Sequence, residues 1–155
     1  MNMLSHSPKE TIKLGKTLAS QLGKGDIVCM FGNLGSGKTV LAKGIAEGLG
    51  IKTKEVISPT FVLMRQYDAK IPLSHFDLYR LDDPKDVLFL GYEEYFYGDG
   101  ITVIEWADRL KYLLPKEYLR VELSVASSTH RNIKFIGKGL RYKKLVKRIN
   151  ENISH

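Results

Sequence analysis

One stretch of eight residues constrains this chain more than any other: Gly32-Asn33-Leu34-Gly35-Ser36-Gly37-Lys38-Thr39. It follows the pattern Gly, four residues, Gly-Lys-Thr, in which backbone N–H groups surround a phosphate chain. Glycines permit this close approach because they lack a Cβ and accept positive φ angles. We expect Lys38 to neutralise the outer phosphates and the Thr39 hydroxyl to hold Mg²⁺.

The residues around this loop have the pattern that a phosphate site needs. Residues 27–31 form an apolar run, typical of a strand buried on both faces. After the loop, apolar residues recur at helical spacing up to Gly48-Leu49-Gly50, so a helix is expected to point its N-terminus at the phosphates. A Gly-rich turn with an incidental lysine is the alternative, and the agreement of strand, loop and helix argues against it.

The remainder of the chain predicts an α/β fold: a single P-loop NTPase-like domain of three layers. Its central sheet should be mostly parallel, with antiparallel strands at the edges. We expect residues 1–136 to form this domain and residues 137–155 to form a basic helix packed on it. Further helices are predicted from Ser7-Pro8 to about Gly23 and from Leu81 through Tyr95. Strands are predicted at 73–77 and 101–106, and an antiparallel pair at 119–125 and 132–136.

Composition places the chain among ordinary globular proteins. Of 155 residues, 43% are hydrophobic and 26% charged. No apolar run reaches the length of a membrane span, and the N-terminal residues lack the apolar core of a secretion signal. A single cysteine, Cys29, lies in the predicted buried strand, which suits a reducing compartment. We therefore expect a cytoplasmic protein that does not contact membranes.

Two carboxylates end predicted strands. Asp77 closes the run at 73–77, and Glu105 closes the run at 101–105. An acid at the carboxyl end of a strand beside a phosphate loop faces the Mg²⁺ in many nucleotide-binding sheets. Such an acid is otherwise a cap or a surface residue. Both are candidates to position metal or water, and their relative roles stay open.

Ser58-Pro59-Thr60 interrupts two short apolar runs. The residue before a proline is held extended, so this segment is either a turn between strands or a switch-like loop. In the second case Thr60 would sense the terminal phosphate and the metal. The spacing alone does not decide between the two interpretations.

These motifs together resemble the TsaE (YjeE) family of small bacterial P-loop ATPases. The similarity extends over about residues 5–136 and rests on five matches: the loop at 32–39, Ser-Pro-Thr at 58–60, His-Phe-Asp-Leu-Tyr-Arg at 75–80, Asp83-Pro84 and Ile-Glu-Trp at 104–106. The loop alone would fit many ATPases, whereas the whole set is specific. The resemblance implies a role in making threonylcarbamoyladenosine beside the anticodon of tRNA, with ATP turnover that supports a TsaB–TsaD pair.

The resemblance also implies a set of site residues. Gly35, Ser36, Gly37, Lys38, Thr39 and Val40 would cradle the phosphates of ATP or ADP, while Thr39 and Glu105 hold Mg²⁺. Asp77 matches an acidic residue near the metal, Thr60 the threonine of the switch loop, and Trp106 the tryptophan beside the glutamate. Ser7 falls where family members contact the nucleotide. The chain departs from the family pattern at Thr129-His130-Arg131, where Thr129 and Arg131 are the candidate contacts.

Two other functions share the phosphate loop. A small-molecule or nucleoside kinase of this size usually needs an Arg-rich lid, and the nearest basic cluster lies in the terminal helix. A nucleotide-gated binding module would bind ATP with negligible turnover. An ATPase with no strong general base or arginine finger of its own should be slow without a partner, because positioning and charge stabilisation supply most of the catalysis of phosphoryl transfer.

The basic residues are concentrated at the C-terminal end. Residues 137–155 contain six basic residues and one acidic residue, so this segment has a net charge of +5 out of the formal +7. We expect Leu140, Leu145, Ile149 and Ile153 to face the body and Lys143, Lys144, Lys147 and Arg148 to face outward. This basic stripe is either a solvated surface or a contact for tRNA or an acidic partner.

Overall fold

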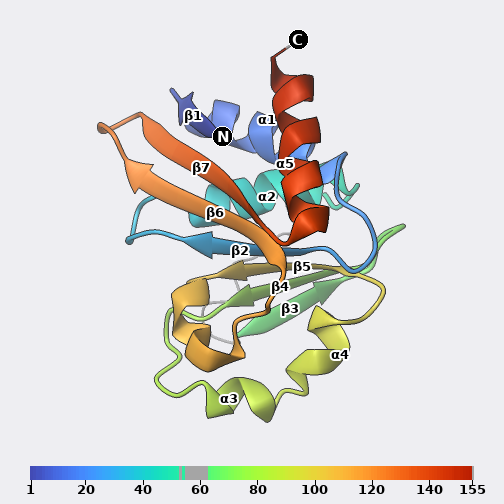
Figure 1. Cartoon of the computed structure of the whole chain (residues 1–155). Helices are drawn as coiled ribbons and strands as arrows, with labels where there is room; N and C mark the ends of the chain where they lie inside the picture. Colours follow the sequence, from blue (N-terminus) through green and yellow to red (C-terminus); the bar gives the residue numbers. More distant parts are fainter. Residues whose placement is uncertain (53, 55–62, 155) are drawn as a thin grey trace.

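Seven strands form one sheet in the computed structural model, which describes residues 1–52, 54 and 63–154 (Figure 1). In chain order the strands are β1 (Asn2–Ser5), β2 (Ile27–Phe31), β3 (Met64–Tyr67), β4 (Leu73–Asp77), β5 (Ile101–Glu105), β6 (Tyr118–Val125) and β7 (Arg131–Lys138). Their order in the sheet is β1-β7-β6-β2-β5-β4-β3. The four central strands are parallel, and the pairs β1–β7, β7–β6 and β4–β3 are antiparallel. This confirms the predicted sheet.

Helices cover both faces of this sheet, as the three-layer prediction requires. One face packs against α1 (Pro8–Ala19), α2 (Lys38–Gly48) and α5 (Leu140–Ile153). The other packs against the short helices α3 (Lys85–Leu88) and α4 (Tyr92–Phe96) and the 3-10 helix η2 (Ala107–Leu113). Along β2, Val28 and Met30 belong to the first core, and Ile27 and Cys29 to the second. This alternation follows from the period of two in a strand.

α1 and α2 approach each other closely through glycines. A Cβ on Gly15 would lie 2.7 Å from the Gly44 Cα, and a Cβ on Gly44 would collide with the Ile12 carbonyl. α1 begins where the sequence predicts, with Ser7 as its cap: the Glu10 backbone N–H donates to Ser7 Oγ at 3.2 Å. Lys38 is the first residue of α2, so the close contact between α1 and α2 fixes the phosphate loop relative to α1.

The predicted helix from Leu81 through Tyr95 is wrong as one element. The chain forms α3 and α4 instead, separated by Gly91 at φ 67° and ψ 44°. A left-handed glycine ends a helix, so apolar spacing on both sides of it does not make a continuous one. Sequence analysis also did not predict β1, which pairs with β7, or the 3-10 helix η2.

α5 confirms a terminal helix, but its apolar face differs from the predicted one. Leu140 is 66% exposed, whereas Tyr142, Leu145 and Ile149 are buried. Positions 142, 145 and 149 recur every three to four residues, and residue 140 lies on the opposite side of the helix. Tyr142 is held further by its hydroxyl, which accepts a hydrogen bond from the Ile27 backbone N–H at 2.9 Å.

Among the described residues, no helix has both the length and the apolar character that crossing a bilayer demands.

Candidate functional site: a pocket at the phosphate loop

The phosphate loop connects the end of β2 to the start of α2. Gly37 caps α2 in the left-handed region, at φ 102° and ψ 15°, where a side chain would be strained. The backbone N–H groups of the first turn of α2 have no partners within the helix, so they form a site for an anion. The local sequence therefore produces the loop that its glycine spacing predicts.

Lys38 lies folded back onto the loop and is only 4% exposed. Its Nζ donates to the Gly32 carbonyl at 2.5 Å, to the Asn33 carbonyl at 3.0 Å and to Ser36 Oγ at 3.3 Å. Burial lowers the pKa of Lys38, and the nearby carboxylates of Glu105 and Asp77 act in the opposite direction. This ammonium group is thus held at the mouth of the loop by carbonyl and hydroxyl oxygens.

The two predicted carboxylates lie side by side at the carboxyl edge of the parallel strands. Asp77 ends β4, Glu105 ends β5, and the two residues are partners in the register of the pair. Asp77 is 3% exposed and Glu105 is 1% exposed. Thr39 Oγ1, from the first turn of α2, donates to Glu105 Oε1 at 2.7 Å. The hydroxyl and the carboxylate predicted to hold Mg²⁺ therefore meet directly.

A residue that sequence reasoning missed completes this cluster. His75 Nε2 lies 2.6 Å from Glu105 Oε2, and both side chains are 2% exposed. The available signal was the position of His75 two residues before Asp77 on the same strand. Alternation in a strand places both residues on one face of the sheet.

Trp106 follows Glu105 directly and covers Lys38. Its backbone is left-handed, at φ 57° and ψ 44°, which is uncommon for a bulky residue and is found most often at functional sites. Lys38 Nζ lies 3.9 Å from the centre of the Trp106 ring, within range of a cation–π interaction. The Tyr79 ring packs against Trp106 at 5.0 Å between centroids.

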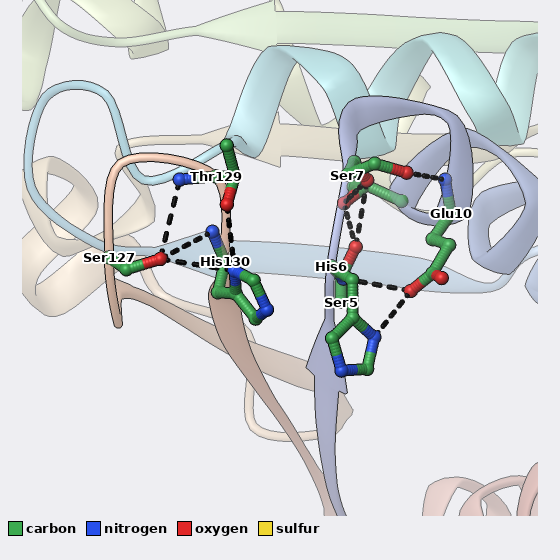
Figure 2. Close-up of polar contacts among 8 residues, drawn as sticks. Ser5, His6, Ser7, Glu10, Ser127, Thr129 and His130 are labelled. Atoms are coloured by element: carbon green, nitrogen blue, oxygen red, sulfur yellow. Dashed lines mark hydrogen bonds and ion pairs between the residues drawn. The ribbon is translucent and has the colours of Figure 1, made fainter.

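The opposite wall of the pocket comes from two turns that are distant in sequence (Figure 2). One turn joins β1 to α1 and carries Ser7, and the other joins β6 to β7 and carries Thr129. The His6 and His130 rings meet edge to face, with centroids 4.8 Å apart. The Thr129 hydroxyl lies 2.8 Å from His130 Nδ1. Contact between the two rings thus joins the two turns.

Arg131, at the start of β7, connects this wall to the phosphate loop. Its Nε donates to the Gly35 carbonyl at 3.1 Å, and its Nη1 donates to the Ser127 carbonyl at 2.9 Å. A guanidinium fixed in this way carries positive charge beside the loop at the end opposite Glu105.

The structure brings nearly all predicted site residues into one pocket of about 520 Å³. Lining it are Ser7, Gly35, Ser36, Gly37, Lys38, Thr39, Val40, Asp77, Glu105, Trp106, Thr129 and Arg131. The pocket is also lined by Pro8, Thr11, Leu34, Tyr79 and Ser128, which are not among the predicted site residues. Thr60 lies outside the described residues. This arrangement can bind an anionic chain along the loop and a cation at its acidic end.

Comparison with known proteins identifies the family. A family model described as "Threonylcarbamoyl adenosine biosynthesis protein TsaE" matches residues 5–133. This chain belongs to the TsaE family. The TsaE protein of Bacillus subtilis strain 168 is 40% identical over 152 residues, which cover 96% of this chain and 94% of the relative. The TsaE protein of Treponema pallidum is 38% identical over 133 residues, 86% of this chain and 98% of the relative.

The fold agrees with this membership. The crystal structure of Bacillus subtilis YdiB superposes with a TM-score of 0.85 at 35% sequence identity, covering 98% of this chain and 95% of that chain. Both the family and the fold expected from the motifs are therefore confirmed. The sheet edge at which the phosphate loop, Asp77 and Glu105 meet lies within the residues that match the family model.

Proposed function

We propose that this chain is a TsaE-type ATPase that binds and slowly hydrolyses ATP with Mg²⁺. Its family membership gives it a role in the biosynthesis of threonylcarbamoyladenosine in tRNA. The observation that supports ATP turnover is the direct contact between Thr39 and Glu105 at the end of a phosphate loop. In P-loop NTPases a loop hydroxyl and a strand-end acid hold the Mg²⁺ that bridges the outer phosphates.

The residues of the pocket fit ATP and Mg²⁺. Mg²⁺ prefers oxygen ligands and is usually bound by one or two protein groups together with phosphate oxygens. Thr39 and Glu105 supply such oxygens, and Asp77 lies in register beside them. Gly35 leaves room for a phosphate, because a Cβ at this position would have no heavy atom within 4 Å. When bound, the metal would neutralise charge that develops on the phosphates.

The other residues of the pocket take complementary roles in this proposal. Lys38 and the N–H groups of residues 35–40 bind the phosphates. Ser7, Thr129 and Arg131 line the far wall, where the rest of the nucleotide would lie. Trp106 covers the Lys38 ammonium and limits its access to water. These contacts orient the nucleotide, which is the main requirement of phosphoryl transfer.

The pocket is poorly equipped for fast hydrolysis on its own. Among the described residues, Lys38 and Arg131 are the two cationic side chains that line it. Lys38 binds loop carbonyls and Arg131 binds the Gly35 and Ser127 carbonyls. An additional cation at the terminal phosphate typically accelerates such reactions by about 10³–10⁵-fold. We propose that TsaD, acting with TsaB, completes the site, and that the ATPase cycle sustains repeated rounds of modification in the cytoplasm.

The basic stripe of α5 is proposed as a contact for tRNA in that assembly. Lys143, Lys144, Lys147 and Arg148 are all exposed. Tyr142, Leu145 and Ile149 hold the other side of the helix on the sheet. Within the described residues the pocket takes no lining from α5, so this contact would be separate from the nucleotide.

Product analysis tests the proposed chemistry. The purified chain is incubated with radiolabelled ATP, Mg²⁺ and candidate acceptors, and the labelled products are separated. Release of inorganic phosphate supports an ATPase, whereas a phosphorylated acceptor would establish a kinase. Glu105→Ala addresses the third alternative: if this variant abolishes turnover but still sustains tRNA modification in cells, the chain is a nucleotide-gated binding module.

A further inference from the structure

Among the residues that the structure describes, His75 is the one buried ionisable side chain beside the pocket to which the proposed function gives no role. It lies on β4, two residues before Asp77, and is 2% exposed. Its register partner on β5 is Val103, whose side chain belongs to the core on the α1–α2 side of the sheet. His75 therefore points toward the same side as the phosphate loop.

Each oxygen of the Glu105 carboxylate lies within hydrogen-bond distance of a different side chain. Thr39 Oγ1 donates to Oε1 at 2.7 Å, and His75 Nε2 lies 2.6 Å from Oε2. An ionised carboxylate can only accept hydrogen bonds, so the His75 Nε2–H is the donor in the second contact. One donor comes from α2 and the other from β4, and together they fix the plane of the carboxylate.

The two donors differ in their relation to the pocket. Thr39 lines the pocket together with Asp77 and Glu105. His75 lies two residue pairs further from the carboxyl edge of the sheet, because it is paired with Val103 while Asp77 is paired with Glu105. The hydrogen bond from His75 therefore holds Oε2 of Glu105, while Thr39 contacts Oε1.

We propose that His75 is a positioning residue, which orients the Glu105 carboxylate so that Oε1 faces Thr39 and the metal site. This inference rests on the proposed function of Glu105 as a metal-binding residue. Partners that orient a ligand in this way typically change metal affinity or activity by about 10–100-fold when they are removed. A purely structural role is the competing explanation, since a buried polar pair also stabilises the fold.

Calorimetry with a non-hydrolysable ATP analogue separates these explanations. Binding is measured with EDTA and with Mg²⁺ for the wild type, His75→Leu, His75→Gln and Val103→Ala. In EDTA, the affinity of His75→Leu for the analogue should be within about twofold of that of the wild type. The increase in affinity on adding Mg²⁺ should be smaller in this variant by about tenfold or more. His75→Gln can still donate to Glu105 and should recover part of it. Val103→Ala, which disturbs the same core position without touching Glu105, should keep the full enhancement.

A second measurement detects the hydrogen bond without nucleotide or metal. Short bonds between an imidazole N–H and a carboxylate shift the shared proton far downfield of backbone amides. Proton NMR of the wild type should show this resonance, and both His75→Gln and Glu105→Gln should remove it.

These readouts distinguish the possible failures. Full Mg²⁺ enhancement in both His75 variants, or absence of the downfield proton in the wild type, would overturn the positioning role. If the wild type shows the downfield proton but does not bind the analogue at all, the proposed function fails and the role of Glu105 in metal binding fails with it. The His75–Glu105 bond would then be structural.

Discussion

The Lys38 ammonium lies 3.9 Å from the centre of the Trp106 ring, so the phosphate loop and the end of β5 are in direct contact. Trp106 is the one tryptophan of the chain. Its ring lies beside the Lys38 ammonium, which would bind an incoming phosphate. The tryptophan fluorescence of the protein therefore reports on this site alone.

The first prediction concerns Lys38. Nucleotide binding should change Trp106 emission in a saturable way, and Lys38→Ala should weaken the affinity at least about tenfold. A charge-assisted contact contributes about 1.5 kcal/mol or more, and 1.4 kcal/mol corresponds to a factor of ten. Lys43→Ala on the same helix is the control and should bind normally. Equal affinity in the two variants would contradict the assignment of the phosphate loop.

The second prediction separates the two carboxylates. Glu105→Gln should reduce Mg²⁺-dependent turnover much more than it reduces ADP binding, because the contacts of the loop with the phosphates remain. Asp77→Asn serves as the comparison, since Asp77 is in register with Glu105 but accepts from the Tyr79 backbone N–H at 3.0 Å. Steady-state kinetics and calorimetry measure both effects. Intact turnover in Glu105→Gln together with a loss in Asp77→Asn would make Asp77 the important acid.

The third prediction concerns the contact between α1 and α2. Gly44→Ala should destabilise the protein by about 1–3 kcal/mol, because overpacking forces the helices apart. In a chain of this size the melting temperature should fall by several degrees. Gly23→Ala is the matched control, since its Cβ would meet only Asp26 Oδ2, at 3.9 Å. Equal melting temperatures for the two variants would show that the approach of α1 to α2 can relax at no cost.

Local patterns were sufficient to predict the parts of the site whose spacing is fixed within one segment. The loop at 32–39, the cap at Ser7 and the acids at the ends of β4 and β5 all belong to this class. The hydrogen bond between His75 and Glu105 depends instead on how two strands pair in the sheet, which no local pattern specifies. The same is true of β1, whose residues become a strand by pairing with β7 at the other end of the chain.

Apolar spacing indicates that a segment is helical, but it does not determine where the helix is interrupted or which of its residues face the core. Residues 81–95 have helical spacing, but Gly91 adopts a left-handed conformation and divides them. In α5, apolar spacing predicts that Leu140 faces the body, whereas burial of Tyr142 sets the phase of the helix and leaves Leu140 exposed. Tertiary contacts decided both cases.

The fourth prediction concerns the basic stripe of α5. Changing Lys143, Lys144, Lys147 and Arg148 to Gln should leave ATP affinity unchanged and weaken association with the tRNA-loaded TsaB–TsaD assembly. Contacts with phosphates release counterions, so the salt dependence of binding should also become flatter. The control changes four exposed lysines elsewhere, Lys52, Lys70, Lys85 and Lys116, to Gln. If both quadruple variants bind the assembly alike across a salt titration, the stripe is a solvated surface.

We propose above that this pocket turns over ATP in support of a tRNA-modifying assembly. The most direct test of this proposal is the rate of phosphate release by the purified chain, measured with and without a TsaB–TsaD pair and compared with that of Lys38→Ala. We predict slow release by the chain alone, a marked stimulation by the pair, and loss of both rates in Lys38→Ala. Absence of release under both conditions, or a rate that Lys38→Ala leaves unchanged, would show that this pocket does not hydrolyse ATP.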